Sequence, residues 1–529
     1  MSLASFKAVA AAGCLLAACT AFAHDDASDQ KLGKVHFQTS CNAAAQERFD
    51  AAMRYQHSFW YRESKKTFEE TLAADPKCAI AYWGIALSLL YNPHVPPPAQ
   101  NLALGLATLE KGKTAGAGTQ RERDYIEALL AFYSDSDKVP HAQRVQRELA
   151  ALEGLASRYP DDDEAQIWYA IWLNVAANPA DKTYANQLKG AAILEPIFKR
   201  QPTHPGVAHY LIHLYDYPPI AEKGLDAAKR YAEIAPAAPH ALHMPSHIFT
   251  RVGYWKESVS TNAASARAAK AEGEPNDQLH AMDYQVYALL QLAQDREARD
   301  VIGEMLEVKG YNANVRGAPY AIAASQARYF IETADWKRAA QMQVSSTRFP
   351  YVDAITHFAR ALGAARSGDP GAAKADVARL AELADKLKHD KDEYWAGQVD
   401  IQRQVAAAWV LHAEGKREEA LAMMKAAADA EDRTEKSIVT PGPLAPAREL
   451  YGAMLLERGM AGEALAQFEA TLAKEPNRFN AYAGAAEAAK RSGDAKKARA
   501  YSEKLVALAG SGNSARPALV AARELLAAR

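Results

Sequence analysis

Seven of the fifteen histidines in this 529-residue chain lie between residues 203 and 287. Two pairs, His209/His213 and His243/His247, have the i, i+4 spacing that places both side chains on one face of a helix. Both members of the second pair follow those of the first by the same 34 residues (243 − 209 and 247 − 213). Imidazoles at this spacing can bind Zn, Cu or Ni, and the constant offset indicates equivalent positions in a repeat.

The histidine pairs belong to a chain that is punctuated like a series of helical hairpins. Gly452, Ala464, Phe468 and Pro476 follow one another near the C-terminus, and the same Phe-to-Pro interval of eight residues recurs near the N-terminus. Glycine permits a tight reversal, alanine lets the second helix pack close to the first, and proline ends that helix. The pattern predicts paired helices over most of the chain.

This spacing resembles the tetratricopeptide repeat (TPR) from about residue 43 to about residue 510, in about twelve hairpins. The resemblance implies an all-α, right-handed superhelical solenoid of helix-turn-helix units. The segment from His243 to Trp255 also resembles a motif of bacterial exported TPR proteins of unassigned function. That second likeness supports the fold and draws attention to the histidine-rich unit.

In TPR arrays the first helix of each unit lines a concave groove in which ligands usually bind. Counted from the preceding prolines, both histidine pairs fall on that face. Pro245 would bend its helix or delay its start, which would leave His240 in the turn before it. Asp216 and Asp283 can act as ligands or as carboxylates that orient imidazoles. The resulting candidate ligand-binding residues are His209, His213, Asp216, His240, His243, His247, Arg251, His280, Asp283 and Tyr287, with Trp83 as an aromatic wall.

Three interpretations of this set stay open. The two i, i+4 histidine pairs could form a Zn or Cu site, which would make the chain a metal-binding protein or a metal-dependent enzyme. The groove could instead bind a peptide, a protein or a small ligand, or the imidazoles could be buried and structural, the class in which we place His57 and His204. The sequence contains no Ser-His-Asp arrangement, HExxH motif or glycine-rich phosphate loop. We therefore favour a scaffold without catalytic residues that binds a partner in its groove.

The start of the chain predicts export to a bacterial periplasm. Lys7 precedes an apolar run from Ala8 to Ala18, as in a signal peptide, and Ala21-Phe-Ala23 is a suitable cleavage site. A lipobox ending at Cys19 is the alternative, and it would attach a lipid anchor. No other apolar run is long enough to span a bilayer, and a net charge of −2 gives no electrostatic case for nucleic acid.

Cys41 and Cys78 are predicted to form a disulfide, because an exported protein meets an oxidising environment. Both precede the first helix of a unit, so the bond would hold the N-terminal end of the array together. Two proline-rich loops, residues 91–98 and 439–446, are long enough to fold back over the groove. The predicted segments are a signal peptide (1–23), an N-terminal segment (24–42), an N-terminal TPR-like array with the histidine-rich groove (43–308), a C-terminal TPR-like array (309–510) and a capping helix (511–529).

Overall fold

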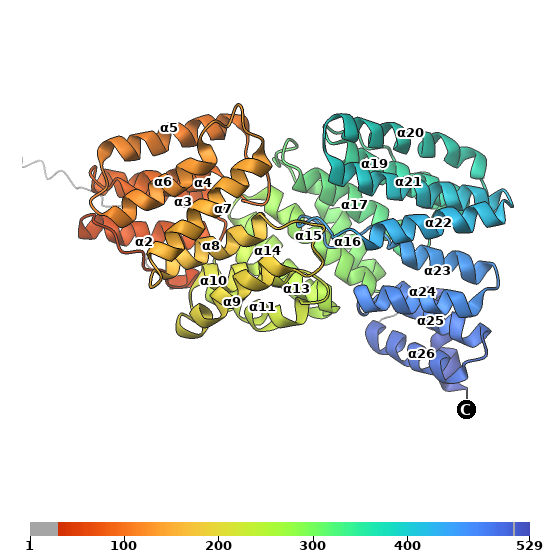
Figure 1. Cartoon of the computed structure of the whole chain (residues 1–529). Helices are drawn as coiled ribbons and strands as arrows, with labels where there is room; N and C mark the ends of the chain where they lie inside the picture. The colour runs from red at the N-terminus through yellow and green to blue at the C-terminus, as the bar shows by residue number, and fades with distance from the viewer. Residues whose placement is uncertain (1–29, 511–513, 529) are drawn as a thin grey trace, which may run out of the picture.

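A computed structural model describes residues 30–510 and 514–528, and these residues form helices without any strand (Figure 1). The predicted signal peptide and the lipobox cysteine lie outside the described residues. None of the helices in the described ranges is long and apolar enough to cross a membrane. The all-α solenoid that the sequence predicts is confirmed, and it consists of TPR-like hairpins.

The first part of the array contains helices that pair in succession along the chain. A 3-10 turn, η1 (Gln30–Leu32), precedes α2 (Ala43–His57), α3 (Tyr61–Ala74), α4 (Ile80–Leu89), α5 (Ala99–Ala115), α6 (Gln120–Tyr133), α7 (His141–Arg158), α8 (Asp163–Val175) and α9 (Ala185–Arg200). The histidine-rich units follow as α10 (Pro205–Tyr215), η2 (Ala221–Gly224), α11 (Leu225–Ile234), α12 (Pro239–His243), α13 (Pro245–Val252), α14 (Trp255–Ala271), α15 (Pro275–Gln291) and α16 (Asp295–Glu307).

The second part of the array continues the same pairing and ends in a single helix that packs on the last pair. Its members are α17 (Gly317–Glu332), α18 (Trp336–Ala340), α19 (Pro350–Arg366), α20 (Pro370–His389), α21 (Glu393–Ala413), α22 (Arg417–Asp432), α23 (Ala447–Glu457), α24 (Ala461–Lys474), α25 (Phe479–Arg491), α26 (Ala495–Ala509) and α27 (Pro517–Ala527).

The Gly-and-Phe signature of the repeat has a steric cause. A Cβ added at Gly84 would lie 2.4 Å from the ring of Phe68, and one added at Gly484 would lie even closer to the ring of Phe468. Only glycine therefore lets the next unit's first helix approach the buried phenylalanine. The same contact occurs at both ends of the array, which explains why the interval from Phe to Pro repeats there.

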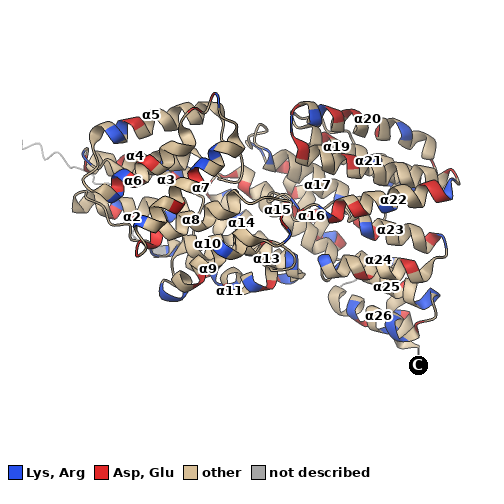
Figure 2. Cartoon of the chain, viewed as in Figure 1, with Lys and Arg blue, Asp and Glu red and all other residues tan. Residues whose placement is uncertain are grey.

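The array curls so that its C-terminal hairpins contact its histidine-rich units. In Figure 1 the chain runs from α15 and α16 near the centre through α17–α22 at the upper right to α23–α26 at the lower right. The indole of Trp255 donates to the carbonyl of Asn477 over 2.7 Å, and Arg516 forms an ion pair with Asp295. Charges of both signs are interspersed over the helices (Figure 2). The interior of the curl is where the candidate site lies.

The N-terminal end is held by the predicted disulfide. Cys41 and Cys78 are bonded, with their Cα atoms 5.0 Å apart. Cys41 lies just before α2 and Cys78 just before α4, the first helices of neighbouring hairpins. The prediction of this bond and of its position is confirmed.

Candidate metal centre

The first group of three histidines joins α10 to the short helix α12. His209 and His213 lie one turn apart on α10, and their Nε2 atoms are 3.1 Å apart. His240 brings its Nε2 atom to 3.2 Å from that of His209. The prediction that His240 sits in a turn is wrong, because α12 already forms a helical turn before Pro245 begins α13.

The second group joins α12, α13 and α15. The Nε2 atoms of His243 and His247 are 3.1 Å apart although Pro245 separates their helices. The ring of His280 lies 4.5 Å from that of His243, measured between centroids. Within each group, one nitrogen from every imidazole lies within 4.8 Å of the others. The sequence predicted one site of four histidines, and the structure instead forms two neighbouring groups of three, here called the histidine cluster.

Hydrogen bonds to Nδ1 fix the tautomer of three of these imidazoles. The Nδ1 of His209 donates to the backbone carbonyl at the end of α2 over 2.7 Å. His243 Nδ1 donates to Asn262 Oδ1 over 2.7 Å, and His247 Nδ1 donates to Asp216 Oδ2 over 2.9 Å. A neutral imidazole that carries its proton on Nδ1 has a bare lone pair on Nε2. His243 and His247 therefore direct two lone pairs at each other without a hydrogen between them.

Burial keeps the cluster neutral. The four histidines of the i, i+4 pairs are at most 4% exposed. Loss of water lowers the pKa of His209 and of His280 to about 3, and it also lowers the pKa of the other four members. Each imidazole would also repel a second positive charge on its neighbours. The cluster is therefore a set of uncharged nitrogen donors at neutral pH.

Asp216 orients the second group from the end of α10. Its carboxylate accepts from His247 Nδ1, from Arg251 Nε over 2.8 Å and from Lys436 Nζ over 2.8 Å. Burial alone would raise the pKa of Asp216, but the charges of Lys436 and Arg251 outweigh it and hold that pKa well below its ordinary value. Asp216 thus stays ionised, and of the two roles considered for it the structure supports orientation of an imidazole.

Two covering segments close the cluster from outside its own helices. The N-terminal covering loop (residues 91–98) brings the ring of His94 to 5.0 Å from that of His213, between centroids. The C-terminal covering segment (residues 433–446) supplies Lys436, and its Thr440 carbonyl accepts from Tyr284, whose ring contacts those of His243 and His247. The expectation that both proline-rich loops fold back over the groove is confirmed.

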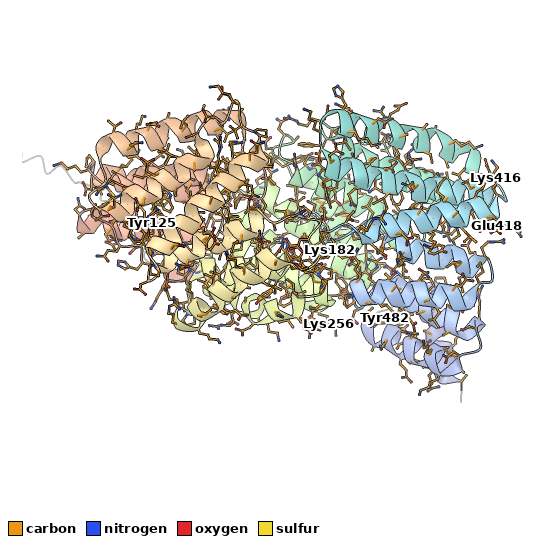
Figure 3. All side chains as sticks on the ribbon, in the orientation of Figure 1. Tyr125, Lys182, Lys256, Lys416, Glu418 and Tyr482 are labelled. Carbon is orange, nitrogen blue, oxygen red and sulfur yellow. A yellow bond between two sulfur atoms is a disulfide. The ribbon has the colours of Figure 1, made fainter. Side chains whose placement is uncertain are left out.

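The C-terminal covering segment is fixed to the N-terminal array by further polar contacts. Lys182 donates to Glu435 over 2.7 Å, and the hydroxyl of Tyr184 donates to the same carboxylate over 3.1 Å. Figure 3 labels Lys182 in the central region where the two parts of the array meet. The C-terminal covering segment is therefore bonded to the loop between α8 and α9 as well as to Asp216 and Tyr284.

A third histidine group lies beside the cluster and is built differently. Glu164 accepts from His57 Nε2 over 3.0 Å and from His204 Nε2 over 2.9 Å. The Nδ1 of His57 meets the hydroxyl of Tyr210 at 3.1 Å, and that of His204 accepts the backbone N–H of Val207 as a helix cap. Every ring nitrogen in this group has a partner of the right kind. The interpretation of His57 and His204 as buried structural residues is confirmed.

Three predicted site residues lie outside the cluster. Asp283 pairs with Arg328 over 2.6 Å, and the hydroxyl of Tyr287 accepts from Arg478 over 2.8 Å. Trp83 is buried in the aromatic core, with its ring 5.6 Å from that of Phe37. The predicted roles of Asp283 as an imidazole partner and of Trp83 as a ligand-facing wall are therefore wrong. Arg328 and Ser325 bind the carboxylate of Asp283 in place of an imidazole, and Trp83 packs against Phe37, Tyr125 and Trp168 instead of lining the groove.

Sequence reasoning missed several residues that contact the cluster. Phe59 packs its ring 4.3 Å from that of His209 and 5.2 Å from that of His240, and it provides the aromatic wall. Asn262 and Lys436 lie in a second helix and in a distant segment, and no spacing rule links them to the histidines. Of these residues, only His94 could be anticipated from the sequence, because it stands in a proline-rich loop that is long enough to fold back over the groove.

Comparison with known proteins gives only distant structural likenesses. No protein-family model and no curated protein matches the chain. The APC/C hetero-tetramer Cut9–Hcn1 aligns with a TM-score of 0.29 and 11% identity, covering 92% of this chain and 90% of that one. Yeast Tom70 aligns with a TM-score of 0.29 and 12% identity, covering 90% and 88%. The TPR domain of P58(IPK) aligns with a TM-score of 0.22 and 13% identity, covering 92% and 99%. At these TM-scores the likeness supports no conclusion on function.

Proposed function

We propose that this protein binds metal ions, one on each three-histidine group of the cluster. The observation that carries the proposal is the His243–His247 pair, in which two Nε2 lone pairs face each other at 3.1 Å. Both Nδ1 protons are already donated to oxygen acceptors. A cation between the two nitrogens relieves this repulsion. A proton would do so only at an acidity that matches their lowered pKa values.

The separations within the groups support the same proposal. Two imidazoles that bind one tetrahedral ion at about 2.0–2.1 Å have their nitrogens about 3.3 Å apart. The measured Nε2 separations are 3.1 Å in both i, i+4 pairs and 3.2 Å between His209 and His240. Three histidines with a fourth position left open is the ligand pattern of catalytic zinc sites, and imidazole also suits copper.

Burial of the cluster favours a metal ion over a peptide as its ligand. Asp216 and Arg251 are 6% exposed, similar to the histidines that they support. The two covering segments occupy the space in which a peptide would contact the imidazoles. A peptide would therefore have to displace Lys436 from Asp216 and His94 from His213.

Elemental analysis of the full chain, purified without a polyhistidine tag, tests the proposal. After exposure to Zn or Cu and removal of loosely bound metal, we expect two ions per chain. The double variant His243→Ala/His247→Ala should retain one ion, because the first group is left intact. As a matched control, His389→Ala removes an exposed histidine far from the cluster and should retain two. Wild-type protein without stoichiometric metal would contradict the proposal.

A second candidate function, ligand binding by the C-terminal array, is favoured by a pocket beside the C-terminal covering segment. The pocket is lined by Tyr320, Tyr351, Trp395, Lys436, Arg448 and Lys474. The rings of Tyr351 and Trp395 stack 4.1 Å apart with an interplanar angle of 10°. The basic side chains of the lining are balanced by Glu431, Asp432, Glu435 and Glu475, so the stacked rings carry this candidate, and they suit a peptide or small ligand with an aromatic or apolar part. Titration of aromatic peptides monitored by tryptophan fluorescence, with Trp395→Phe as the control, tests this function.

We also propose that the mature chain is exported. The Cys41–Cys78 disulfide supports this location, because such bonds persist in oxidising compartments. Mass spectrometry of the mature N-terminus in a bacterial host distinguishes cleavage after Ala23 from lipidation of Cys19. A chain that retains Met1 in the cytoplasm would contradict export.

A further inference from the structure

The two three-histidine groups lie next to each other. The rings of His213 and His247, one from each group, are 6.1 Å apart between centroids. His240 and His243 also belong to different groups, and their rings are 6.0 Å apart. Ions held by the two groups would therefore be neighbours that one small ligand can touch together.

The charges around the cluster restrict which ions fit. All six candidate ligands are neutral imidazoles, and no carboxylate belongs to either group. Asp216 is the carboxylate that contacts the cluster, and Arg251 and Lys436 already neutralise it. Two divalent ions would add four positive charges to a buried site whose nearest charged groups sum to one positive charge. Burying that charge is very unfavourable unless anions enter with the ions.

We infer that the cluster holds a pair of copper ions that binds dioxygen between them, an inference that rests on the proposed metal binding. In the reduced pair each ion carries a single positive charge, which halves the added positive charge, and three neutral imidazoles suit it. In the oxidised pair the ions are divalent, and among divalent first-row metals nitrogen sites bind copper most tightly. The anion that the oxidised pair requires is then the ligand that bridges it.

The reaction of two Cu(I) ions with dioxygen requires no further reactant. Each of two Cu(I) ions gives one electron to dioxygen, which yields two Cu(II) ions and one bridging peroxide. The two negative charges of the peroxide offset the two positive charges that oxidation adds. No proton is needed for this step.

His94 is placed to contact the bound dioxygen. It comes from the N-terminal covering loop, packs beside His213, and has a buried Nε2 atom without a hydrogen-bond partner in the described part of the chain. A buried nitrogen of this kind normally has a partner. In the oxygenated pair His94 Nε2–H donates to the peroxide, which makes it a positioning residue for that ligand.

Anaerobic loading of the metal-free full chain with two equivalents of Cu(I), followed by dioxygen, tests the inference. We expect uptake of one dioxygen per two copper ions, a peroxide-to-copper charge-transfer absorption, and no electron paramagnetic resonance signal, because the two Cu(II) spins couple. Addition of hydrogen peroxide to the Cu(II) form should produce the same absorption. Two independent Cu(II) signals of full intensity without that absorption would overturn the inference while leaving metal binding in place. Absence of any bound metal would refute both.

Two variants separate the pair from a single ion. His280→Ala should hold one tightly bound copper ion, show the signal of an isolated Cu(II), and lose the charge-transfer absorption. His94→Phe should keep two coupled copper ions but lose the bound dioxygen about tenfold faster, as expected for loss of one hydrogen bond to a charged ligand. His389→Ala should behave as the wild type in each assay. Full charge-transfer absorption in His280→Ala would also overturn the inference.

Discussion

The His57–Glu164–His204 group and the histidine cluster lie side by side in the array, and the two differ in their hydrogen bonds. The His57–Glu164–His204 group holds three potential metal ligands within 4.8 Å of one another, and so does each of the two three-histidine groups of the cluster. In the His57–Glu164–His204 group, Glu164 accepts a hydrogen from each imidazole, so every donor faces an acceptor. In the cluster the Nδ1 hydrogens of His209, His243 and His247 are donated outwards, and the Nε2 lone pairs of His243 and His247 face each other. Ligand spacing alone therefore does not identify a metal site, because the positions of the protons decide whether the ring nitrogens are free to bind an ion.

The largest effect that would sharpen this contrast is expected at Glu164. Glu164→Gln keeps the shape but replaces one acceptor oxygen by an N–H donor, which then faces an imidazole N–H. We expect the free energy of unfolding to fall by about 3 kcal/mol, as for a buried donor left without its charged acceptor. Urea denaturation of the metal-free protein measures this loss. Two ions should still bind to the folded variant, and loss of both ions would show that the groups are one site.

The next effect is expected at Asp216, which orients an imidazole of the cluster. Asp216→Asn keeps one oxygen but removes the charge behind His247, so metal affinity at the second group should fall by about 10–100-fold. Competition with a chelator of known affinity measures it. The first group, which has no bond to Asp216, provides an internal reference within the same variant. An equal loss at both groups would contradict the assignment of Asp216 to the second.

A smaller effect is expected at Asn262, the uncharged partner of His243. Asn262→Ala removes the acceptor of the His243 Nδ1 hydrogen and lets the other tautomer form, which places the hydrogen on Nε2. We expect about a tenfold loss of affinity at the second group. The same chelator competition applies, and unchanged affinity would show that this tautomer is not fixed by Asn262.

The smallest effect is expected in the pH dependence of the folding stability, and it comes from the His57–Glu164–His204 group. Burial would raise the pKa of Glu164, but the imidazoles of His57 and His204 outweigh it and hold the pKa well below 4.5. The unfolded chain takes up a proton near pH 4.5 and the folded chain does not, so this contribution is complete above pH 4.5 and is lost below it. At pH 4 the loss should be about 1 kcal/mol. The stability difference between wild type and Glu164→Gln should therefore narrow at low pH, and a widening difference would contradict the sign.

Features that depend on local periodicity could be predicted from the sequence. The i, i+4 spacing of His209 and His213 places them on one face of whatever helix they join, and the repeat offset assigns the same arrangement to His243 and His247. The Cys41–Cys78 bond was also predictable, because both cysteines precede the first helix of neighbouring units. Proline marked the two covering segments, since it excludes helix there.

Features that depend on the path of the superhelix were decided only by the tertiary structure. His240 and His280 complete the two groups from α12 and α15, whereas Asp283 pairs with Arg328 and Trp83 packs in the aromatic core. Lys436 reaches Asp216 across 220 residues because the array curls back on itself. The tautomers of the imidazoles follow from oxygen atoms on other helices, such as Asn262 Oδ1. The sequence determined by itself that His209 and His213 share a helix face and that His243 and His247 repeat their spacing. The fold decided where the imidazole protons lie, because proton positions depend on neighbours that periodicity does not specify.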